Sequence, residues 1–148
     1  PGLSNIDVTH GTVSVGATAT WTDIERDVLP RLPAFGPIVR RFGSPQIRNV
    51  ATLAGNVVNG APIADSLPLL MVLDAELEIA GPKCTRRRSL TGFYTGYKRN
   101  DLAPDELLTR VSFALPPATD RLRLYKVSRR TDLDIATVGA AVRVAEAD

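Results

Sequence analysis

The chain has 148 residues, of which 44% are hydrophobic and 23% are charged, as in an ordinary globular domain. Its formal net charge of +2 is too small to indicate a nucleic-acid partner, and no apolar run reaches the roughly 18 residues of a membrane span. One cysteine, Cys84, and one histidine, His10, exclude an internal disulfide and a metal centre held by this chain alone, and a lone cysteine is compatible with the reducing cytoplasm.

The first half of the chain predicts one strand followed by helices. Residues 1–5 lack an initiator Met and the charged and apolar regions of a signal peptide, so we expect a piece of a larger cytoplasmic protein. Period-two alternation predicts a strand over 12–17. A capping-box pattern that starts at Thr22 predicts a helix, which Pro33 ends. After it we expect a short segment over 38–42 and a turn-rich stretch over 51–65. A buried helix follows over 66–75, with Pro68 in its first turn.

The second half predicts strands. Residues 76–80 alternate, and 86–90 are their expected hairpin partner after a Gly-Pro turn. An aromatic loop over 91–99 precedes three more alternating segments, at 110–115, 121–127 and 138–144. Helices that precede a run of strands indicate the α+β class, and we expect an antiparallel sheet flanked by helices.

Residues 42–65 hold the greatest concentration of groups able to bind a ligand. Small residues allow the backbone to approach a ligand closely, and backbone N–H groups in turns bind anions. Thr52, Asn56 and Asn59 add donors for phosphate or ribose oxygens, and Asp65 is placed to accept from sugar hydroxyls. The alternative is that these residues only shape turns and cap a helix. The stretch is neither a Rossmann fingerprint nor a P-loop, so from the residues alone both interpretations stay open.

The segment 46–56 (QIRNVATLAGN), followed by Pro62 and Asp65-Ser66, resembles the signature of the FAD domain of xanthine dehydrogenases. Carbon monoxide dehydrogenase medium subunits and related molybdenum hydroxylases share it. Further similarity lies at 93–98, 104–108, 125–130 and 134–136, and these matches keep their order along nearly the whole chain. The small FAD and iron–sulfur subunit of bacterial xanthine dehydrogenase is among the proteins that the chain resembles.

The resemblance implies that residues 1–148 are part of an FAD-binding domain, namely its second subdomain in the molybdopterin dehydrogenase-type fold. A first subdomain with a pyrophosphate loop and a C-terminal subdomain are then expected to be absent. The resemblance also assigns the cofactor-binding residues: Ala51, Thr52, Gly55 and Asn56 on the phosphate side, Asn59 near the dinucleotide, Asp65 at a ribose, Phe42 beside the isoalloxazine, Leu108 packed on the flavin and Lys126 near the flavin ring. No catalytic or metal-binding residue is implied.

Two positions depart from the family pattern. Ala54 stands where relatives often have glycine, and a positive φ there would strain it by about 1 kcal/mol or more; we expect the site to tolerate the methyl group instead. The register of Lys126 depends on the length of the following loop. Period two places Lys126 on the same side as Leu122 and Leu124, which is unusual unless it meets an anion or a polar ring. The alternative is that it extends to water.

The implied function is electron transfer. In the parent complex a molybdenum cofactor on another subunit hydroxylates a purine such as xanthine or hypoxanthine, and electrons pass through 2Fe-2S clusters to the FAD bound here and on to NAD+ or another acceptor. The implied partners are the molybdenum-cofactor subunit, the iron–sulfur domain and that acceptor, and the fragment alone is expected to be inactive. The alternatives are a flavin-free interaction module, or the medium subunit of a carbon monoxide dehydrogenase-like or other aromatic-heterocycle hydroxylase. A basic ligand-binding or RNA-binding domain is disfavoured by the small net charge.

Overall fold

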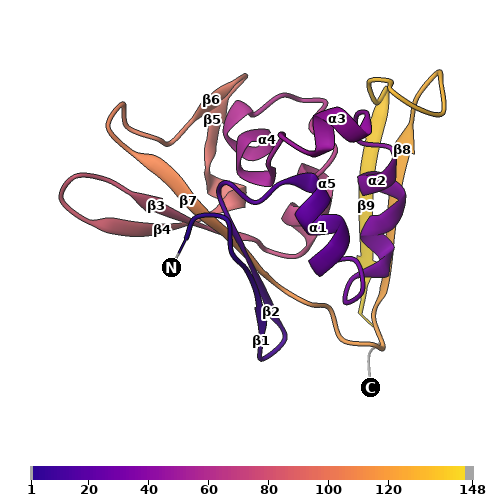
Figure 1. The fold of residues 1–148 in the computed structure, drawn as a ribbon, viewed down its shortest axis with the longest axis horizontal. Helices are drawn as coiled ribbons and strands as arrows, with labels where there is room; N and C mark the ends of the chain where they lie inside the picture. The colour runs from indigo at the N-terminus through magenta and orange to yellow at the C-terminus, as the bar shows by residue number, and fades with distance from the viewer. Residues whose placement is uncertain (1, 146–148) are drawn as a thin grey trace.

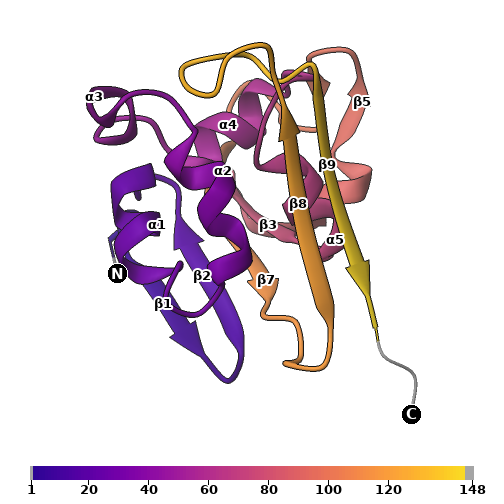
Figure 2. The same ribbon diagram turned by 90° about the vertical axis from the view of Figure 1, so that its right-hand side faces the viewer.

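The structure, a computed structural model, describes residues 2–145 (Figure 1). Three layers follow one another: a five-stranded sheet, a layer of short helices, and a separate two-stranded ribbon (Figures 1 and 2). The elements in chain order are β1 (Ile6–Thr9), β2 (Thr12–Gly16), α1 (Trp21–Asp27), η1 (Pro33–Phe35), α2 (Gly36–Arg40), α3 (Pro45–Arg48), α4 (Leu53–Asn59), α5 (Leu67–Val72), β3 (Glu76–Ala80), β4 (Thr85–Ser89), η2 (Leu90–Gly92), β5 (Tyr94–Gly96), β6 (Arg99–Asn100), β7 (Leu107–Ala114), β8 (Arg121–Val127) and β9 (Val138–Val144).

The five-stranded sheet is antiparallel throughout, in the order β1-β2-β7-β3-β4. Successive side chains of a strand point to opposite faces, so the alternating apolar residues bury one face against the helices. Val13, Leu77 and Val111 lie fully buried on this face. The outer face is polar, and Ser14 and Ser112 hydrogen-bond across β2 and β7 at 3.0 Å. The expected α+β class with an antiparallel sheet flanked by helices is confirmed.

The first helix begins two residues earlier than the sequence pattern predicts. Thr20, not Thr22, is its N-cap: Asp23 N–H donates to the Thr20 hydroxyl, and the Asp23 carboxylate accepts from Thr20 N–H at 2.9 Å. The earlier start buries Trp21 and Ile24 together in the core. Thr22 instead donates from its hydroxyl to the side chain of Asn49 at 2.6 Å. The helix ends at Asp27, well before Pro33.

The stretch 51–65 is not turn-rich as predicted, because α4 occupies its middle. Thr52 caps this helix and Gly60, in the left-handed conformation at φ 56°, ends it. Leu53 and Val57 lie one turn apart and bury one face of the helix. The amides of Asn56 and Gly60 bond back to Thr52 and Val57 within the helix. The predicted turns are therefore limited to 60–65, and anion binding by turn amides stays a prediction.

Most of the other predicted elements are confirmed. The buried helix is α5 with a proline in its first turn, and the alternating segments form β2, β3, β4, β7, β8 and β9. The aromatic loop contains a short β5–β6 hairpin, and β1 was not predicted. The ribbon β8–β9 pairs antiparallel in a sheet of its own and packs on α5 and α2 (Figure 2).

A polar network ties β4 to the loop before β7. The Arg86 guanidinium donates to both Glu106 carboxylate oxygens, at 2.8 and 2.7 Å, and to Asp101 at 3.0 Å. These Arg86 bonds, with a further bond from Ala103 N–H, lower the pKa of Glu106 from its ordinary 4.5 to about 2. Because the carboxylate form is favoured in the folded state, it stabilises the fold at any pH above the ordinary pKa of 4.5. This stabilisation is lost as the pH falls to the folded-state pKa of about 2.

Replacing Glu106 by Gln should therefore lower thermal stability at neutral pH but not at strong acid. We expect Glu106→Gln to melt below wild type at pH 7, and the two melting curves to converge as pH falls from 4.5 towards 2. Melting followed by circular dichroism across this pH range measures the difference. The gap at pH 7 should be modest, because water still reaches this pair, whose side chains are 31% and 15% exposed, and screens its charges. A gap that is constant with pH would contradict the role of the carboxylate charge.

Candidate functional site

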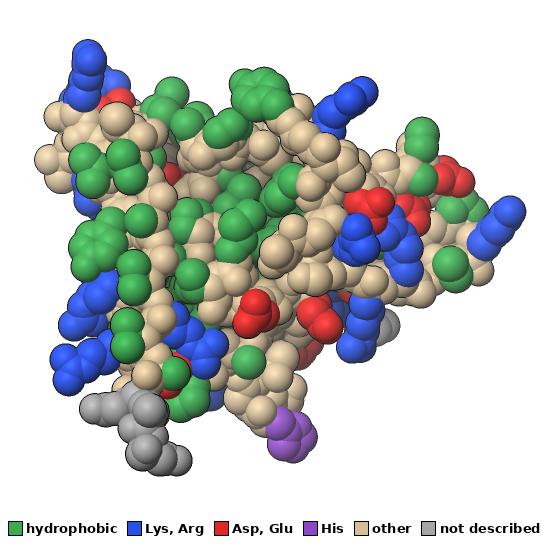
Figure 3. Space-filling model, turned by 180° about the vertical axis from the view of Figure 1, so that it is seen from behind, with side chains coloured by type: hydrophobic (Ala, Val, Ile, Leu, Met, Phe, Trp, Pro, Cys, Tyr) green, Lys and Arg blue, Asp and Glu red, His purple; other side chains and the backbone are tan. Residues whose placement is uncertain are grey.

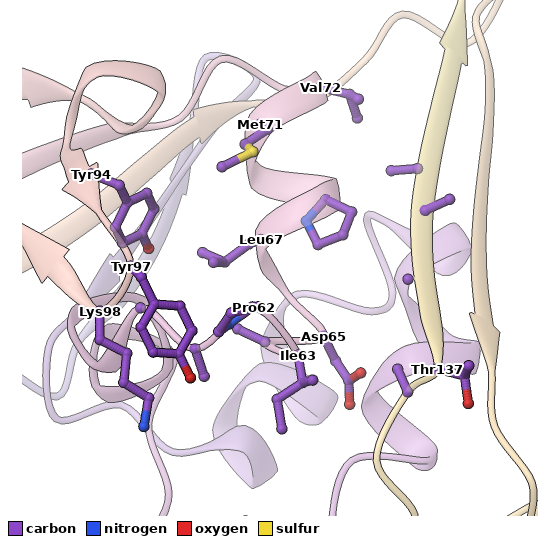
Figure 4. A pocket seen from close by; sticks show the side chains of 18 of the residues that line it. Pro62, Ile63, Asp65, Leu67, Met71, Val72, Tyr94, Tyr97, Lys98 and Thr137 are labelled. Carbon is purple, nitrogen blue, oxygen red and sulfur yellow. The ribbon is translucent and has the colours of Figure 1, made fainter.

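Two adjoining cavities lie where the helical layer meets the β8–β9 ribbon. The tyrosine cavity, of about 720 Å³, lies between α5, the β5–β6 hairpin with Tyr94 and Tyr97, and β9 (Figure 4). The lysine cavity, of about 530 Å³, is lined by Lys126, by the turn after α2 and by the end of α4. Both volumes lie in the range of roughly 300–1,000 Å³ typical of ligand pockets.

The two cavities share a wall and form one extended groove. The shared wall consists of Ala61, Ile63, Ala64, Asp65 and Ala136. From behind, hydrophobic side chains gather in a hollow between the ribbon and the rest of the molecule (Figure 3). The groove is therefore long, apolar along much of its length, and polar at the end that holds Lys126.

The lysine cavity brings together five of the predicted cofactor residues. They come from the turn after α2, from α4, from the segment before α5, and from β8: Phe42, Asn56, Asn59, Asp65 and Lys126. Separate elements thus converge on one cavity, although the sequence places them far apart.

A buried ion pair lines the lysine cavity. Lys126 Nζ lies 2.5 Å from Asp65 Oδ2, and the side chains are only 5% and 9% exposed. Lys126 Nζ also donates to the carbonyl of Arg41 at 3.3 Å. The prediction that Lys126 lies on the inner side of β8 with Leu122 and Leu124 is confirmed, and the alternative that it extends to water is wrong. Asp65 neutralises the charge that burial would otherwise make costly.

A buried hydroxyl orients the amide of Asn56. Ser66, which is fully buried, donates from its hydroxyl to Asn56 Oδ1 at 2.5 Å. Because this bond occupies the amide oxygen, the amide NH2 group is the part of Asn56 left to donate to a ligand in the cavity.

Phe42 forms an aromatic wall of the same cavity. Its ring stacks on Trp21 with centroids 4.1 Å apart and an interplanar angle of 23°. Trp21 is fully buried in the core and holds the Phe42 ring from behind. Phe42 is then a rigid ring beside a cavity, which suits a planar partner.

Comparison with known proteins decides the family. The sequence profile of the FAD binding domain in molybdopterin dehydrogenase matches residues 1–116, which is most of the chain. The chain belongs to this family of FAD-binding domains. It is 37% identical over 136 residues to the putative xanthine dehydrogenase FAD-binding subunit XdhB of Escherichia coli K12, an alignment that covers 88% of this chain and 46% of that subunit.

Two further similarities extend over nearly the whole domain. It is 33% identical over 147 residues to the nicotinate dehydrogenase FAD-subunit of Eubacterium barkeri, covering 96% of this chain and 50% of that subunit. Carbon monoxide dehydrogenase from Oligotropha carboxidovorans superposes with a TM-score of 0.89 at 31% identity, covering 98% of this chain and 51% of that one. The domain thus spans about half the length of the relatives it matches.

The lining of the lysine cavity offers the kinds of groups that FAD binding requires. The cavity supplies amide donors from Asn56 and Asn59, a carboxylate from Asp65 and the ring of Phe42, and it continues into the tyrosine cavity. Asp65 Oδ2 is bonded to Lys126, so the second carboxylate oxygen is the one left for a hydroxyl. Donors, an acceptor and a ring are the groups that a flavin with its ribityl and phosphate portions requires.

Three predicted residues lie at the start of α4 and do not line either cavity. Thr52 caps the helix by accepting from Gly55 N–H at 3.0 Å. A Cβ on Gly55 would lie only 3.0 Å from the Thr52 hydroxyl oxygen, so glycine suits this close approach. Ala51 accepts from Trp21 N–H through its carbonyl. Ala54 is a buried helical residue whose φ is not positive, so the expected tolerance of its methyl group is confirmed.

Leu108 is also placed away from the cavities. It lies buried in β7 opposite Ile79 and belongs to the main core. The structure therefore does not bring Leu108 to the other predicted residues, and its contact with the flavin stays a prediction.

The sequence did not predict the tyrosine cavity. The Tyr94 ring packs against Gly60, and a Cβ atom added to Gly60 would lie 3.1 Å from that ring. The Tyr94 hydroxyl donates to the carbonyl of Val57 at 2.8 Å. Burial raises the pKa of Tyr94 to about 12. Tyr97 is exposed at the hairpin end with Lys98 beside it (Figure 4). The available signal was the presence of Tyr94 and Tyr97 within the matching segment 93–98.

Within residues 2–145, no helix has the length and apolar character needed to cross a membrane. The same part of the chain holds no cluster of three or more His, Cys, Asp or Glu side chains that would bind a metal ion.

Proposed function

We propose that the lysine cavity holds the FAD of a molybdenum hydroxylase, and that this domain passes electrons from iron–sulfur clusters to an acceptor. The observation that carries the proposal is the convergence of Phe42, Asn56, Asn59, Asp65 and Lys126 on one cavity in a chain of the FAD-binding family. The named relatives supply the enzyme class, because they include xanthine and nicotinate dehydrogenase FAD subunits.

Each residue has a binding role in this proposal. Phe42 lies beside the isoalloxazine, Asp65 accepts from a ribose hydroxyl, and Lys126 lies near the flavin ring while it neutralises Asp65. Asn56 and Asn59 donate amide hydrogens to the dinucleotide. Ala51, Thr52 and Gly55 are assigned to the phosphate side, and Leu108 to flavin packing, on the family resemblance.

When bound, FAD would link the iron–sulfur clusters to the acceptor, because a flavin exchanges single electrons and also delivers a hydride. The domain itself would bind and orient the ring, and Phe42, supported from behind by Trp21, would shield one face of the ring from water. No side chain of the lysine cavity needs to act as a nucleophile or general base.

The proposed partners are the molybdenum-cofactor subunit and the iron–sulfur domain of the parent complex. We assign the approach of the acceptor, NAD+ or another, to the tyrosine cavity, because it adjoins the lysine cavity along 61–65. Purine hydroxylation is the proposed parent reaction, on the similarity to the named xanthine dehydrogenase subunit. A nicotinate or carbon monoxide hydroxylase is the alternative, on the other two similarities.

Asn56→Ala in the complete assembly tests the site. We expect flavin retention to weaken about tenfold, which corresponds to one lost hydrogen bond with its partner left unpaired. The half-reaction at the molybdenum site should be unchanged. Flavin content is measured as FAD released from the denatured protein and quantified by its fluorescence, because iron–sulfur clusters of the assembly also absorb in the visible range. Asn5→Ala is the matched control, because Asn5 is exposed and remote from both cavities.

The outcomes separate the competing functions. Normal flavin content in Asn56→Ala would remove this site assignment. A wild-type assembly that releases no flavin on denaturation and takes up no added FAD would favour a flavin-free interaction module.

A further inference from the structure

The loop between β8 and β9, residues 128–137, forms one wall of the lysine cavity. Leu133, Asp134, Ile135 and Ala136 of this loop line the cavity. At its base Thr137 N–H donates to the carbonyl of Val127 at 2.7 Å. The shape of the cavity therefore depends on where this loop is held.

Hydrogen bonds within residues 128–137 fix the shape of the loop. The Asp134 carboxylate accepts from Arg130 N–H at 2.8 Å and from Ile135 N–H at 3.0 Å. Leu133 adopts the left-handed conformation at φ 52°, which costs energy for a residue with a side chain. These bonds shape the loop but do not attach it to the helical layer.

Arg41, at the end of α2, makes that attachment. Its Nε donates to the carbonyl of Thr131 at 3.0 Å and its Nη1 to the carbonyl of Lys126 at 3.3 Å. Among residues 2–145, the bond to Thr131 is the only hydrogen bond that joins the loop to the helical layer. A guanidinium suits this task because its donors diverge in a fixed plane.

The same residue also fixes the buried lysine. Lys126 Nζ donates to the carbonyl of Arg41 at 3.3 Å and to Asp65 Oδ2. Arg41 and Lys126 thus exchange two hydrogen bonds, one in each direction. Arg41 itself does not line the lysine cavity, so any effect on a ligand there passes through the loop and Lys126.

We infer that Arg41 is a positioning residue for the flavin cavity: it holds the 128–137 loop as a wall and Lys126 against Asp65. The inference rests on the proposed function, since it assigns the ligand of that cavity as FAD. Loss of the guanidinium loosens the wall while the core under it stays folded, because no residue of 128–137 belongs to the main core cluster.

The test compares Arg41→Met with Arg40→Met in the complete assembly. Arg40 is the neighbouring, exposed arginine of α2. Within residues 2–145 its side chain makes no hydrogen bond, and its carbonyl accepts from Arg48, a bond that the variant keeps. Each variant removes one tryptic site, so the two are matched for proteolysis. Three quantities are measured: FAD affinity after removal and titration of the flavin, iodide quenching of bound-flavin fluorescence, and the rate of tryptic cleavage after Arg129 and Arg130 without flavin.

For Arg41→Met we expect an FAD dissociation constant raised about tenfold, greater iodide quenching, and cleavage at the loop accelerated about tenfold, because proteolysis reports the open population. Arg40→Met should match wild type in all three. Wild-type affinity in Arg41→Met would overturn the inference even if cleavage increased, while leaving the proposed function intact. A wild-type protein that binds no FAD would overturn the proposed function and the inference with it, and would be recognised before any variant is compared.

Discussion

Asp65→Ala is expected to lower the free energy of unfolding by about 3 kcal/mol, at the lower end of the roughly 3–5 kcal/mol for breaking a buried ion pair. The substitution leaves the Lys126 ammonium without a counterion in a side chain only 5% exposed. The effect lies at the lower end because the Lys126 ammonium keeps its hydrogen bond to the carbonyl of Arg41. Urea unfolding followed by circular dichroism measures the change, which is a large share of a typical domain's stability.

Flavin retention should be lost in the same variant, so the two effects need separating. The double variant Asp65→Ala with Lys126→Met removes both charges, and we expect it to regain most of the lost stability, as uncharged replacements of buried pairs do. It should still fail to retain FAD, because both binding groups are gone. Asp105→Ala, a change at an exposed carboxylate, is the control and should match wild type. A double variant as unstable as Asp65→Ala would show that the cost does not arise from the unpaired lysine.

The strands were predictable because their signal is local. Period-two alternation places Val13, Val111 and Leu122 inward without knowledge of any neighbour, and the structure buries all three. The short strand β1 has only four residues, which is too few for an alternation to stand out.

The first helix shows where a local signal becomes ambiguous. Thr20 and Thr22 are each followed three residues later by an acidic residue, Asp23 and Glu25, so both fit a capping box. Burial of Trp21 decides between them, and that burial depends on partners such as Phe42 from a later segment. Tertiary packing overrides the local pattern here.

The cavities were the least predictable part. The resemblance assigned individual residues, and five of them line the lysine cavity. The tyrosine cavity depends on how the β8–β9 ribbon sits against α5 and the β5–β6 hairpin, which no periodicity encodes. In 51–65 the small residues and amides indicated turns, whereas burial of Leu53 and Val57 selects a helix.

The aromatic wall gives the second large effect. Phe42→Ala should lower the free energy of unfolding by about 2 kcal/mol, less than the roughly 3–5 kcal/mol for a fully buried phenylalanine, because Phe42 is only partly buried. It should also weaken FAD binding at least about tenfold, because a stacking ring is lost. Trp21 is the only tryptophan of the chain, and its emission should shift to the red when water reaches its uncovered face.

Phe42→Ala removes both packing on Trp21 and a ring for the flavin. Phe42→Tyr and Phe42→Leu separate these two losses. Tyrosine keeps an aromatic ring against Trp21, and we expect near-wild-type flavin affinity and tryptophan emission. Leucine keeps apolar volume over Trp21 but cannot stack on a planar ring, so stability should largely recover while flavin affinity stays low. Equilibrium unfolding and flavin titration on the same preparations separate the two effects. If Phe42→Leu binds FAD as tightly as wild type, the ring only packs on Trp21, and the isoalloxazine lies elsewhere than against this wall of the lysine cavity.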